Sequence, residues 1–399
     1  MMKLRHLRHP VRSLQTAREM VAIRRQMGKI AAEGKRRFGA DPRYKLDSVT
    51  AGFLPCGSGH SDDFAMLDRI CSAYARAIEC RSPERYCVSP WWEEVRRQSL
   101  GPVLRALRSR ELSVLQAMYR NFYRDPCSAG LIAVPYGMRK AYFGKTIPNL
   151  HRRYYLYEVL HRIDHWRAET AGQFPVSTLA TPEVGNPFGA VIEGIRVEAG
   201  APYRHYCAYK VSSLLDAGTA TVVEIGGGFG GMAYYLLRDQ PRVRYYGFDT
   251  PESVALTTYY LMRAFPQLTF ALYGEHREPR EADVTLLPLF ELPSAARQSA
   301  DVTFSSHAMT DISRDALAEY LSQIARVTRH YFLHIGVDPA AQSIREVIGG
   351  YDDRFSLVES RRSGWNTHKA DGLEDLECLY QVRHVDREQQ PALGCCQHA

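Results

Sequence analysis

Residues 221–231 read Thr-Val-Val-Glu-Ile-Gly-Gly-Gly-Phe-Gly-Gly, and Met-Ala-Tyr-Tyr-Leu-Leu follows at 232–237. A short apolar strand therefore runs directly into a glycine-rich turn, and a helical pattern begins at once. Glycine permits sharp turns and leaves room for a ligand beside the backbone, and the first turn of a helix presents free N–H groups. The stretch predicts a strand–loop–helix unit that binds a ligand on its loop.

Short apolar segments continue to alternate with helical patterns beyond this unit. We expect helices at 230–238 and 252–265, and strands at 221–225, 243–248, 269–273, 283–287, 301–305, 329–335 and 376–383. Such alternation predicts an α/β fold, with a mostly parallel Rossmann-like sheet covered by helices on both faces. We place this domain at 205–388, with a helix at 205–216 leading into it.

The first half of the chain has a different pattern, which is mainly helical. We expect a basic helical arm at 1–50, a helical accessory region at 60–204 with a β-hairpin near 188–204, and a disordered tail at 389–399. Within these regions helices are expected at 11–38, 61–80, 91–125 and 149–170, with a linker at 52–59.

The net charge of +7 is concentrated in the arm. Residues 1–45 contain thirteen Lys or Arg and three acidic residues, which gives this segment alone a charge of +10. Such an arm could contact an anionic membrane surface or a phosphorylated substrate, or it could be a solvated helix packed on its own protein or a partner. Few aromatic residues accompany the charges, which disfavours nucleic acid. The oligomeric state stays open.

The cysteines and the hydropathy bear on the compartment. The nine cysteines form no CxxC pair and no zinc-like spacing, which favours reduced thiols and no structural metal. No apolar run approaches the roughly 20 residues of a membrane span, and no signal-peptide core is present at the N-terminus. We expect a cytoplasmic protein, with peripheral association with the inner membrane face as an option.

The loop after the first strand fits GxGxxG through Gly226, Gly228 and Gly231, a pattern that alone would also suit a dinucleotide. Glu224 stands two residues before the first glycine, where it would repel a pyrophosphate but would oppose a cationic ligand or order the loop. This favours S-adenosylmethionine over NAD(P). Asp249 ends the next strand, where a carboxylate can accept hydrogen bonds from ribose hydroxyls. Its alternative role is to cap the helix near Pro251.

Several segments resemble one known family. Val223–Leu237 looks like the first motif of a family of bacterial sugar O-methyltransferases, which are class I S-adenosylmethionine-dependent enzymes. Further likeness lies in Asp249-Thr-Pro-Glu-Ser, Tyr259-Tyr260-Leu261, Asp301–Ile312 and Gly185-Asn186-Pro187. The likeness covers 130–335 and is strongest at 221–260. This sequence has Asp311-Ile312 where the family has Glu-Met, and Ser305 where Asn is common.

The resemblance implies a seven-stranded sheet with its last strand antiparallel, and a sugar hydroxyl as the methyl acceptor. The accessory region would then select the acceptor. The cofactor-binding residues expected from the motif and the strand ends are Glu224, Gly226, Gly227, Gly228, Gly230, Asp249 and Ser306.

A sugar hydroxyl reacts readily only when a base takes its proton. His307 and Asp311 follow the strand at 301–305, so we expect His307 to be the base and Asp311 to orient it or bind a hydroxyl. If a helix began at Met309, Asp311 would lie in its first turn. Both residues also have an ordinary structural role. His307 could be a loop histidine that is hydrogen-bonded to the backbone, and Asp311 could be a carboxylate that the helix dipole favours at the start of a helix. The alternative is a Mg²⁺ ion bound by paired carboxylates and the hydroxyls of the sugar. We do not favour it, because Asp315 is the only acidic residue near Asp311 in the sequence.

Five further side chains are weaker candidates for the cleft, for which packing in the core or at an interface is the ordinary role: His334, Trp365, Tyr154, Tyr155 and Tyr157. Three alternatives to a sugar methyltransferase stay open. They are O- or N-methylation of a non-sugar natural product, an NAD(P)-dependent oxidoreductase, and a non-catalytic scaffold.

Overall fold

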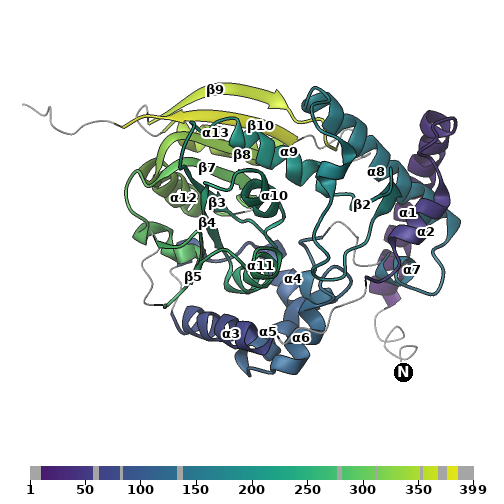
Figure 1. Ribbon diagram of the computed structural model, residues 1–399, viewed down its shortest axis with the longest axis horizontal. Coiled ribbons are helices and arrows are strands. Elements are labelled where there is room, and N and C mark those ends of the chain that lie inside the picture. The colour runs from purple at the N-terminus through teal and green to yellow at the C-terminus, as the bar shows by residue number, and fades with distance from the viewer. Residues whose placement is uncertain are drawn as a thin grey trace, which may run out of the picture.

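The computed structural model describes residues 10–56, 63–80, 84–132, 138–275, 281–310, 312–350, 354–366 and 375–384. Its centre is an eight-stranded sheet in the order β5-β6-β4-β3-β7-β8-β10-β9 (Figure 1). The pairs from β5 to β8 are parallel, whereas β10 pairs antiparallel with both β8 and β9. The strands are β3 (Thr221–Ile225), β4 (Arg244–Asp249), β5 (Phe270–Leu272), β6 (Val284–Pro288), β7 (Ala300–Ser306), β8 (Thr328–Val337), β9 (Phe355–Arg362) and β10 (Asp375–Val382).

The α/β fold and the antiparallel last strand are confirmed, but the expectation of seven strands is wrong. Each of the seven predicted strands is present, and β9 is an eighth that the sequence pattern did not indicate. Leu357 and Val358 on β9 are exposed, and charged residues follow them. Because β9 is an edge strand with little of it buried, it lacks the apolar alternation by which strands are recognised.

The sheet separates two hydrophobic clusters, one on each face. Val222 belongs to the larger cluster and Val223 to the smaller, as the alternation of side chains along a strand requires. The larger cluster includes residues of α9 (Ala201–Ser212), α10 (Gly231–Asp239) and α11 (Pro251–Ala264). The smaller includes residues of α12 (Arg314–Val327) and α13 (Asp338–Ile348). Helices therefore cover both faces.

The accessory region packs onto this framework and shares its larger core. The helices of the basic arm are α1 (Pro10–Phe38) and α2 (Leu46–Gly52). Those of the accessory region are α3 (Phe64–Glu79), α4 (Pro90–Val95), α5 (Gly101–Arg108), α6 (Leu112–Tyr119), α7 (Arg139–Tyr142) and α8 (Asn149–Glu169). Short helical elements of this region are η2 (Glu84–Tyr86), the π-helical η3 (Arg96–Leu100), η4 (Pro126–Ser128) and η6 (Val176–Leu179), and a further one, η8 (Leu289–Ser294), follows β6 in the sheet domain. The predicted hairpin is present as β1 (Ala190–Ile192) and β2 (Ile195–Val197).

The long helix expected at 91–125 is wrong, because the segment is broken into shorter elements. A π-helical turn separates α4 from α5, and Pro102 stands at the start of α5. Arg110 has a φ of 53°, which ends the helical path between α5 and α6. These breaks let α3 pack against α5, α6 and α11.

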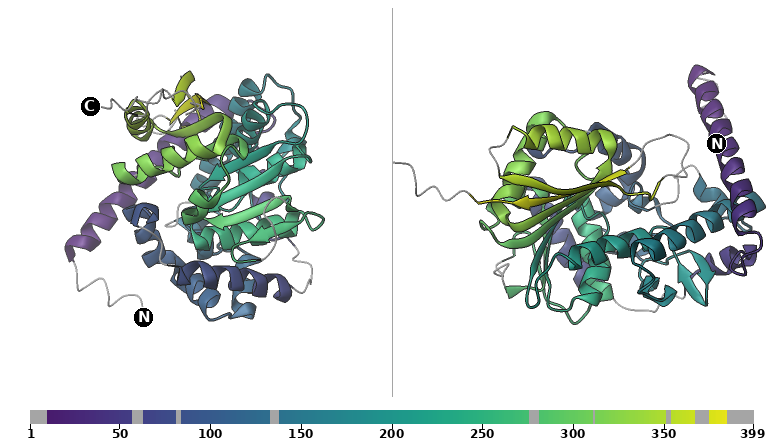
Figure 2. Two further views of the ribbon diagram at one scale, coloured as in Figure 1. Left: turned by 90° about the vertical axis from the view of Figure 1, so that its left-hand side faces the viewer. Right: turned by 90° about the horizontal axis from the view of Figure 1, so that it is seen from above.

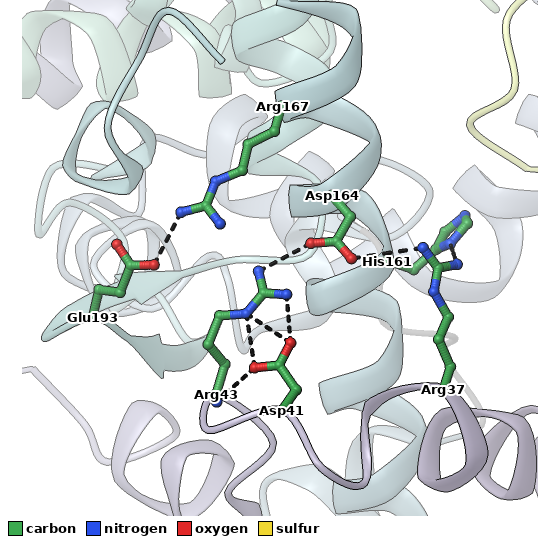
Figure 3. A network of polar contacts seen from close by, with 7 residues as sticks. All are labelled: Arg37, Asp41, Arg43, His161, Asp164, Arg167 and Glu193. Carbon is green, nitrogen blue, oxygen red and sulfur yellow. Dashed lines mark hydrogen bonds and ion pairs between the residues drawn. The ribbon is translucent and has the colours of Figure 1, made fainter. Parts of the chain in front are cut away.

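The basic arm is part of the fold from Met27 onward. Met27, Ile30 and Phe38 are buried, and α1 packs along α8. Arg43 forms ion pairs with Asp41 at 2.7 Å and with Asp164 of α8 at 3.0 Å (Figure 3). Arg37 reaches Asp164 at 3.6 Å and His161 at 3.1 Å, and Arg167 pairs with Glu193 in the same network. The N-terminal part of α1 extends beyond the body of the molecule (Figure 2).

None of the helices in the described ranges combines the length and the apolar character that a membrane crossing requires. The linker expected at 52–59 and the tail expected at 389–399 lie partly or wholly outside the described residues.

Candidate functional site

The glycine-rich loop leaves the carboxyl end of β3 in left-handed backbone conformations. Gly226 has a φ of 76° and Gly228 a φ of 62°, and Gly230 at the start of α10 has a φ of 85°. The Gly226 N–H donates to Phe248 O of β4 at 2.8 Å. A Cβ on Gly226 would lie 2.0 Å from the Cβ of Ala308, so the β3 loop touches the loop that follows β7. Only glycine fits this contact.

Glu224 lies beneath the loop rather than on the surface that a ligand would touch. Its Oε2 accepts a 2.5 Å hydrogen bond from the Tyr245 hydroxyl of β4, and it would meet a Cβ on Gly227 at 2.9 Å. Burial raises the pKa of Glu224 to about 7. Of the two roles considered for this residue, its position fits the ordering of the loop.

Asp249 ties the same loop to the end of β4. Its Oδ2 accepts a hydrogen bond from Gly228 N at 2.8 Å, and its Oδ1 accepts one from Thr250 N at 2.6 Å. Burial raises the pKa of Asp249 to about 7, although both backbone bonds favour the charged form. The alternative role as a helix cap is wrong, because Thr250 occupies the N-cap position of α11.

A cavity of about 440 Å³ lies against this edge of the sheet. Gly226, Gly228 and Asp249 line it from β3 and β4, and Ser306 and His307 line it from the end of β7. Its size is within the range of small-molecule and cofactor sites. The expected residues Glu224, Gly227 and Gly230 support the loop from positions that do not line this cavity.

The accessory region supplies the opposite wall. Trp91 and Trp92 of α4 line the cavity, together with Tyr86, Val88 and Leu131. Trp92 is fixed by a buried carboxylate on α11, because its Nε1 donates to Glu252 at 2.7 Å and Arg96 pairs with the same group at 2.6 Å. The Trp91 side chain is 56% exposed, so an aromatic ring stands open at the cavity.

A larger cavity of about 970 Å³ adjoins the first one on its Asp249 side. Asp249, Thr250 and Leu289 line both cavities, whereas Ser306 and His307 line only the smaller. The two spaces therefore meet at the end of the site where a ribose is expected, away from the predicted base.

His307 occupies the first position after β7 with a φ of 59°. Its N–H donates to Ile335 O of β8 at 2.9 Å, and its Nε2 lies 3.8 Å from Oδ2 of Asp375. The Ser306 hydroxyl beside it is 2.7 Å from the Tyr203 hydroxyl of α9. The predicted base and one predicted cofactor residue thus lie together at the cavity, held by three further elements.

Asp311, the second catalytic candidate, lies outside the described residues. The helix whose first turn would have held Asp311 does not begin at Met309, since α12 begins at Arg314 with Ser313 as its N-cap. The Ser313 side chain accepts a hydrogen bond from Ala316 N, which fixes this start. Position 311 therefore precedes the first turn of the helix.

The weaker candidates lie away from the cavity. His334 is fully buried on β8, and burial lowers its pKa to about 3, so its ring is neutral. Trp365 is buried against Tyr203 and Tyr206. Tyr155 and Tyr157 are buried too, and Tyr154 packs against the same core. Within the described ranges, no group of three His, Cys, Asp or Glu side chains is placed to hold a metal ion.

Asp375 was missed because no motif surrounds it. The signal that could have found it is topological: β10 is antiparallel, so its first residue lies at the edge where the parallel strands end. The aromatic wall at Trp91 was missed because sequence alone does not show which accessory segment faces the loop.

Searches against protein-family models and against curated proteins found no match. Among solved structures, magnesium protoporphyrin IX methyltransferase from Synechocystis PCC 6803 with bound SAM is 11% identical with a TM-score of 0.35, over 57% of this chain and 94% of that one. Geranyl diphosphate methyltransferase in complex with SAM is 8% identical with a TM-score of 0.34, over 47% and 88%. A SAM-dependent methyltransferase from Aquifex aeolicus is 12% identical with a TM-score of 0.31, over 44% and 89%.

At these TM-scores the likenesses carry nothing about the activity or substrate of this chain. Its fold is evident from its own strand order, which is that of a Rossmann-like α/β sheet with an antiparallel strand inserted beside β8.

Proposed function

We propose that this protein transfers a methyl group from S-adenosylmethionine to a hydroxyl of a saccharide or glycosylated metabolite. One observation carries the proposal. The glycine loop and Asp249 line the same cavity as Ser306 and His307, at one edge of the sheet. A nucleoside-binding carboxylate and a base thus share one space beneath an aromatic cover.

The described residues fit the cofactor. Asp249 stands at the end of the strand next to the glycine loop, where it can accept hydrogen bonds from ribose hydroxyls. Gly226 and Gly228 present bare backbone to the cavity, which allows the close approach of a ligand. When bound, S-adenosylmethionine supplies a methyl group activated by a sulfonium.

The protein has two tasks in such a reaction. It must hold the acceptor oxygen in line with the methyl group, and it must remove the hydroxyl proton. His307 is placed for the second task at the cavity surface. Trp91 offers an exposed aromatic ring against which the apolar face of a sugar ring can pack. The assignment of a sugar rests on the family resemblance and on Trp91.

Calorimetric titration of the purified protein tests the cofactor. We expect S-adenosylmethionine and its demethylated product to bind at micromolar to low millimolar levels, and NADH not to bind. Binding of NADH alone would favour an oxidoreductase. Incubation with labelled cofactor and a cell extract, followed by mass identification of the product, tests the acceptor. A labelled product without a sugar would favour a different natural product, and no product from any extract would favour a scaffold.

The exposed part of the basic arm is the basis of a second, smaller proposal. Arg37 and Arg43 are engaged by Asp164, whereas Arg24, Arg25 and Lys29 are exposed on α1. The exposed apolar side chains Val21 and Ile23 stand beside these cations. This segment would contact phosphate groups of an anionic membrane surface or of a phosphorylated substrate.

A further inference from the structure

The first residue of β10 reaches the catalytic edge of the sheet from the direction opposite to that of the other strands. Asp375 pairs in register with Val337, the last residue of β8, and its side chain is 2% exposed. Its Oδ2 lies 3.8 Å from His307 Nε2, and Asn366 Nδ2 donates a hydrogen bond to the same oxygen. Ser363 N donates to its backbone oxygen at 2.8 Å. The carboxylate is therefore held in place beside the histidine.

The backbone also restricts His307. Its positive φ and the hydrogen bond from its N–H to Ile335 O fix the backbone from which the imidazole ring extends. The centroid of the Tyr203 ring of α9 lies 6.2 Å from that of the imidazole. The titratable groups that the structure describes around the ring are Asp375 on β10, His334 on β8 and Tyr203 on α9. Burial keeps His334 neutral, and burial raises the pKa of Tyr203 well above its usual value. Among these groups Asp375 is the one whose carboxylate faces Nε2 of the ring, at 3.8 Å.

We propose that Asp375 is the positioning residue for His307, because its buried carboxylate faces Nε2 of the ring. When the acceptor oxygen forms its bond to the methyl carbon and the carbon–sulfur bond breaks, the hydroxyl proton moves to the imidazole of His307. The ring then carries a positive charge that the buried carboxylate stabilises. The proton leaves to solvent when the product departs. This inference rests on the proposed function for the identity of the reaction.

The test follows the titration of His307 directly. In protein labelled with ¹³C-histidine, the His307 signal is assigned by its loss in His307→Gln, and its titration midpoint is measured without any acceptor. We expect Asp375→Asn to lower the midpoint by about one pH unit, because an opposite charge at this distance is removed. Glu377→Gln is the matched control, since Glu377 is a buried carboxylate on the same strand that is bound instead to Tyr206 and Arg361.

A second variant gives a change of opposite sign. Asn366→Ala removes the amide that shares Oδ2 of Asp375 with His307, so it should raise the His307 midpoint. A residue needed only for folding would not produce opposite shifts in the two variants. A midpoint in Asp375→Asn within about 0.2 of the wild-type value, or a lowered midpoint in Asn366→Ala, would overturn the proposal.

Activity provides the second measurement. Asp375→Asn should lower kcat at least tenfold, leave the affinity for S-adenosylmethionine unchanged, and move the acid limb of the pH profile by the same amount as the titration midpoint. Because the titration requires no turnover, the two proposals fail separately. Shifted midpoints without methyl transfer would count against the proposed function, and methyl transfer with unshifted midpoints would count against the role of Asp375.

Discussion

The carboxylate of Glu224 on β3 accepts a 2.5 Å hydrogen bond from the hydroxyl of Tyr245 on β4, and both side chains are buried beneath the glycine loop. The bond joins the two central strands at the point where the cofactor is expected to lie. It also satisfies a carboxylate that would otherwise be buried without compensation. Burial raises the Glu224 pKa to about 7 despite this bond, so the group changes charge in the neutral range.

Tyr245→Phe should therefore destabilise the protein, and more so at pH 8 than at pH 6. The carboxylate loses its donor, which costs about 1–3 kcal/mol when the group is ionised. Below pH 7 Glu224 binds a proton and the loss becomes smaller. Urea unfolding at both pH values measures the difference. Tyr209→Phe on α9, which also removes one tyrosine hydroxyl, should show no such pH dependence, and equal losses at the two pH values would contradict the assignment.

Asp249 should make cofactor affinity depend on pH. Its pKa near 7 lies well above the ordinary value of 3.8, so the carboxylate is ionised above pH 7 and protonated below it. The ionised form accepts hydrogen bonds from ribose hydroxyls, so affinity should fall as the pH falls through 7, by at most tenfold per unit.

Asp249→Asn should bind S-adenosylmethionine more weakly and should flatten this profile, and Asp249→Ala should bind more weakly still. Calorimetric titrations between pH 6 and pH 8 measure both effects. Wild-type affinity in Asp249→Ala would remove the ribose assignment.

His307→Ala should reduce kcat by roughly 10²–10⁴-fold, because a general base contributes about this much. The affinity for S-adenosylmethionine should stay within about twofold, since the expected ribose contacts are made at Asp249. Initial rates with the identified acceptor, together with calorimetry, measure the two quantities. If His307→Ala stays active and a chelator abolishes turnover, a metal ion performs the activation instead.

Two truncations should separate the parts of the basic arm. Removal of residues 1–20 keeps Met27, Ile30, Phe38 and the ion pairs of Arg43, so the melting temperature should not change. Removal of residues 1–45 exposes core on α8 and should destabilise the protein by several kcal/mol, at about 1.5–3 kcal/mol for each large apolar side chain lost. Thermal unfolding and cofactor titration of both truncations provide the comparison.

The exposed cations of the arm should bind anionic surfaces. Arg24→Glu combined with Arg25→Glu should release the full-length protein from phosphatidylglycerol vesicles in sedimentation, and neutral phosphatidylcholine vesicles should bind neither form. Arg242→Glu with Arg244→Glu makes the same change of charge at exposed positions at the start of β4 and is the control. If the arm variant still binds the vesicles, Arg24 and Arg25 do not make this contact. If the control variant also loses binding, the net charge of the protein and not the arm determines the binding.

The local sequence was sufficient to predict those parts of the fold in which apolar residues and glycines recur at a regular spacing. The strand before Gly226, the helix after it and the acid at Asp249 can be predicted from residues that lie within some 30 positions of one another. A buried parallel strand appears in the sequence as an apolar run, and the turn after it as a run of glycines. The β9 strand left no such mark, since it is an exposed edge. The break near Arg110 also left none, because a positive φ at a non-glycine residue depends on its surroundings.

The catalytic edge was predictable only in part. The position of His307 after a parallel strand indicated that it faces the cofactor, since ligands bind at the carboxyl ends of such strands. Its neighbour Asp375 comes from the last strand, 68 positions later in the sequence, and their proximity depends on the reversed direction of β10. Such a pair requires the topology of the whole sheet, and a local motif cannot specify it.

The missing side chain at Gly226 has a mechanical consequence. Ala308 occupies the space that a Cβ would take, and Ala308 follows His307 directly in the chain. The loop after β3 and the loop after β7, which both line the cavity, are thus in direct contact, and neither can shift without pressing on the other. Occupancy on one side should therefore alter affinity on the other, and to the same factor in both directions.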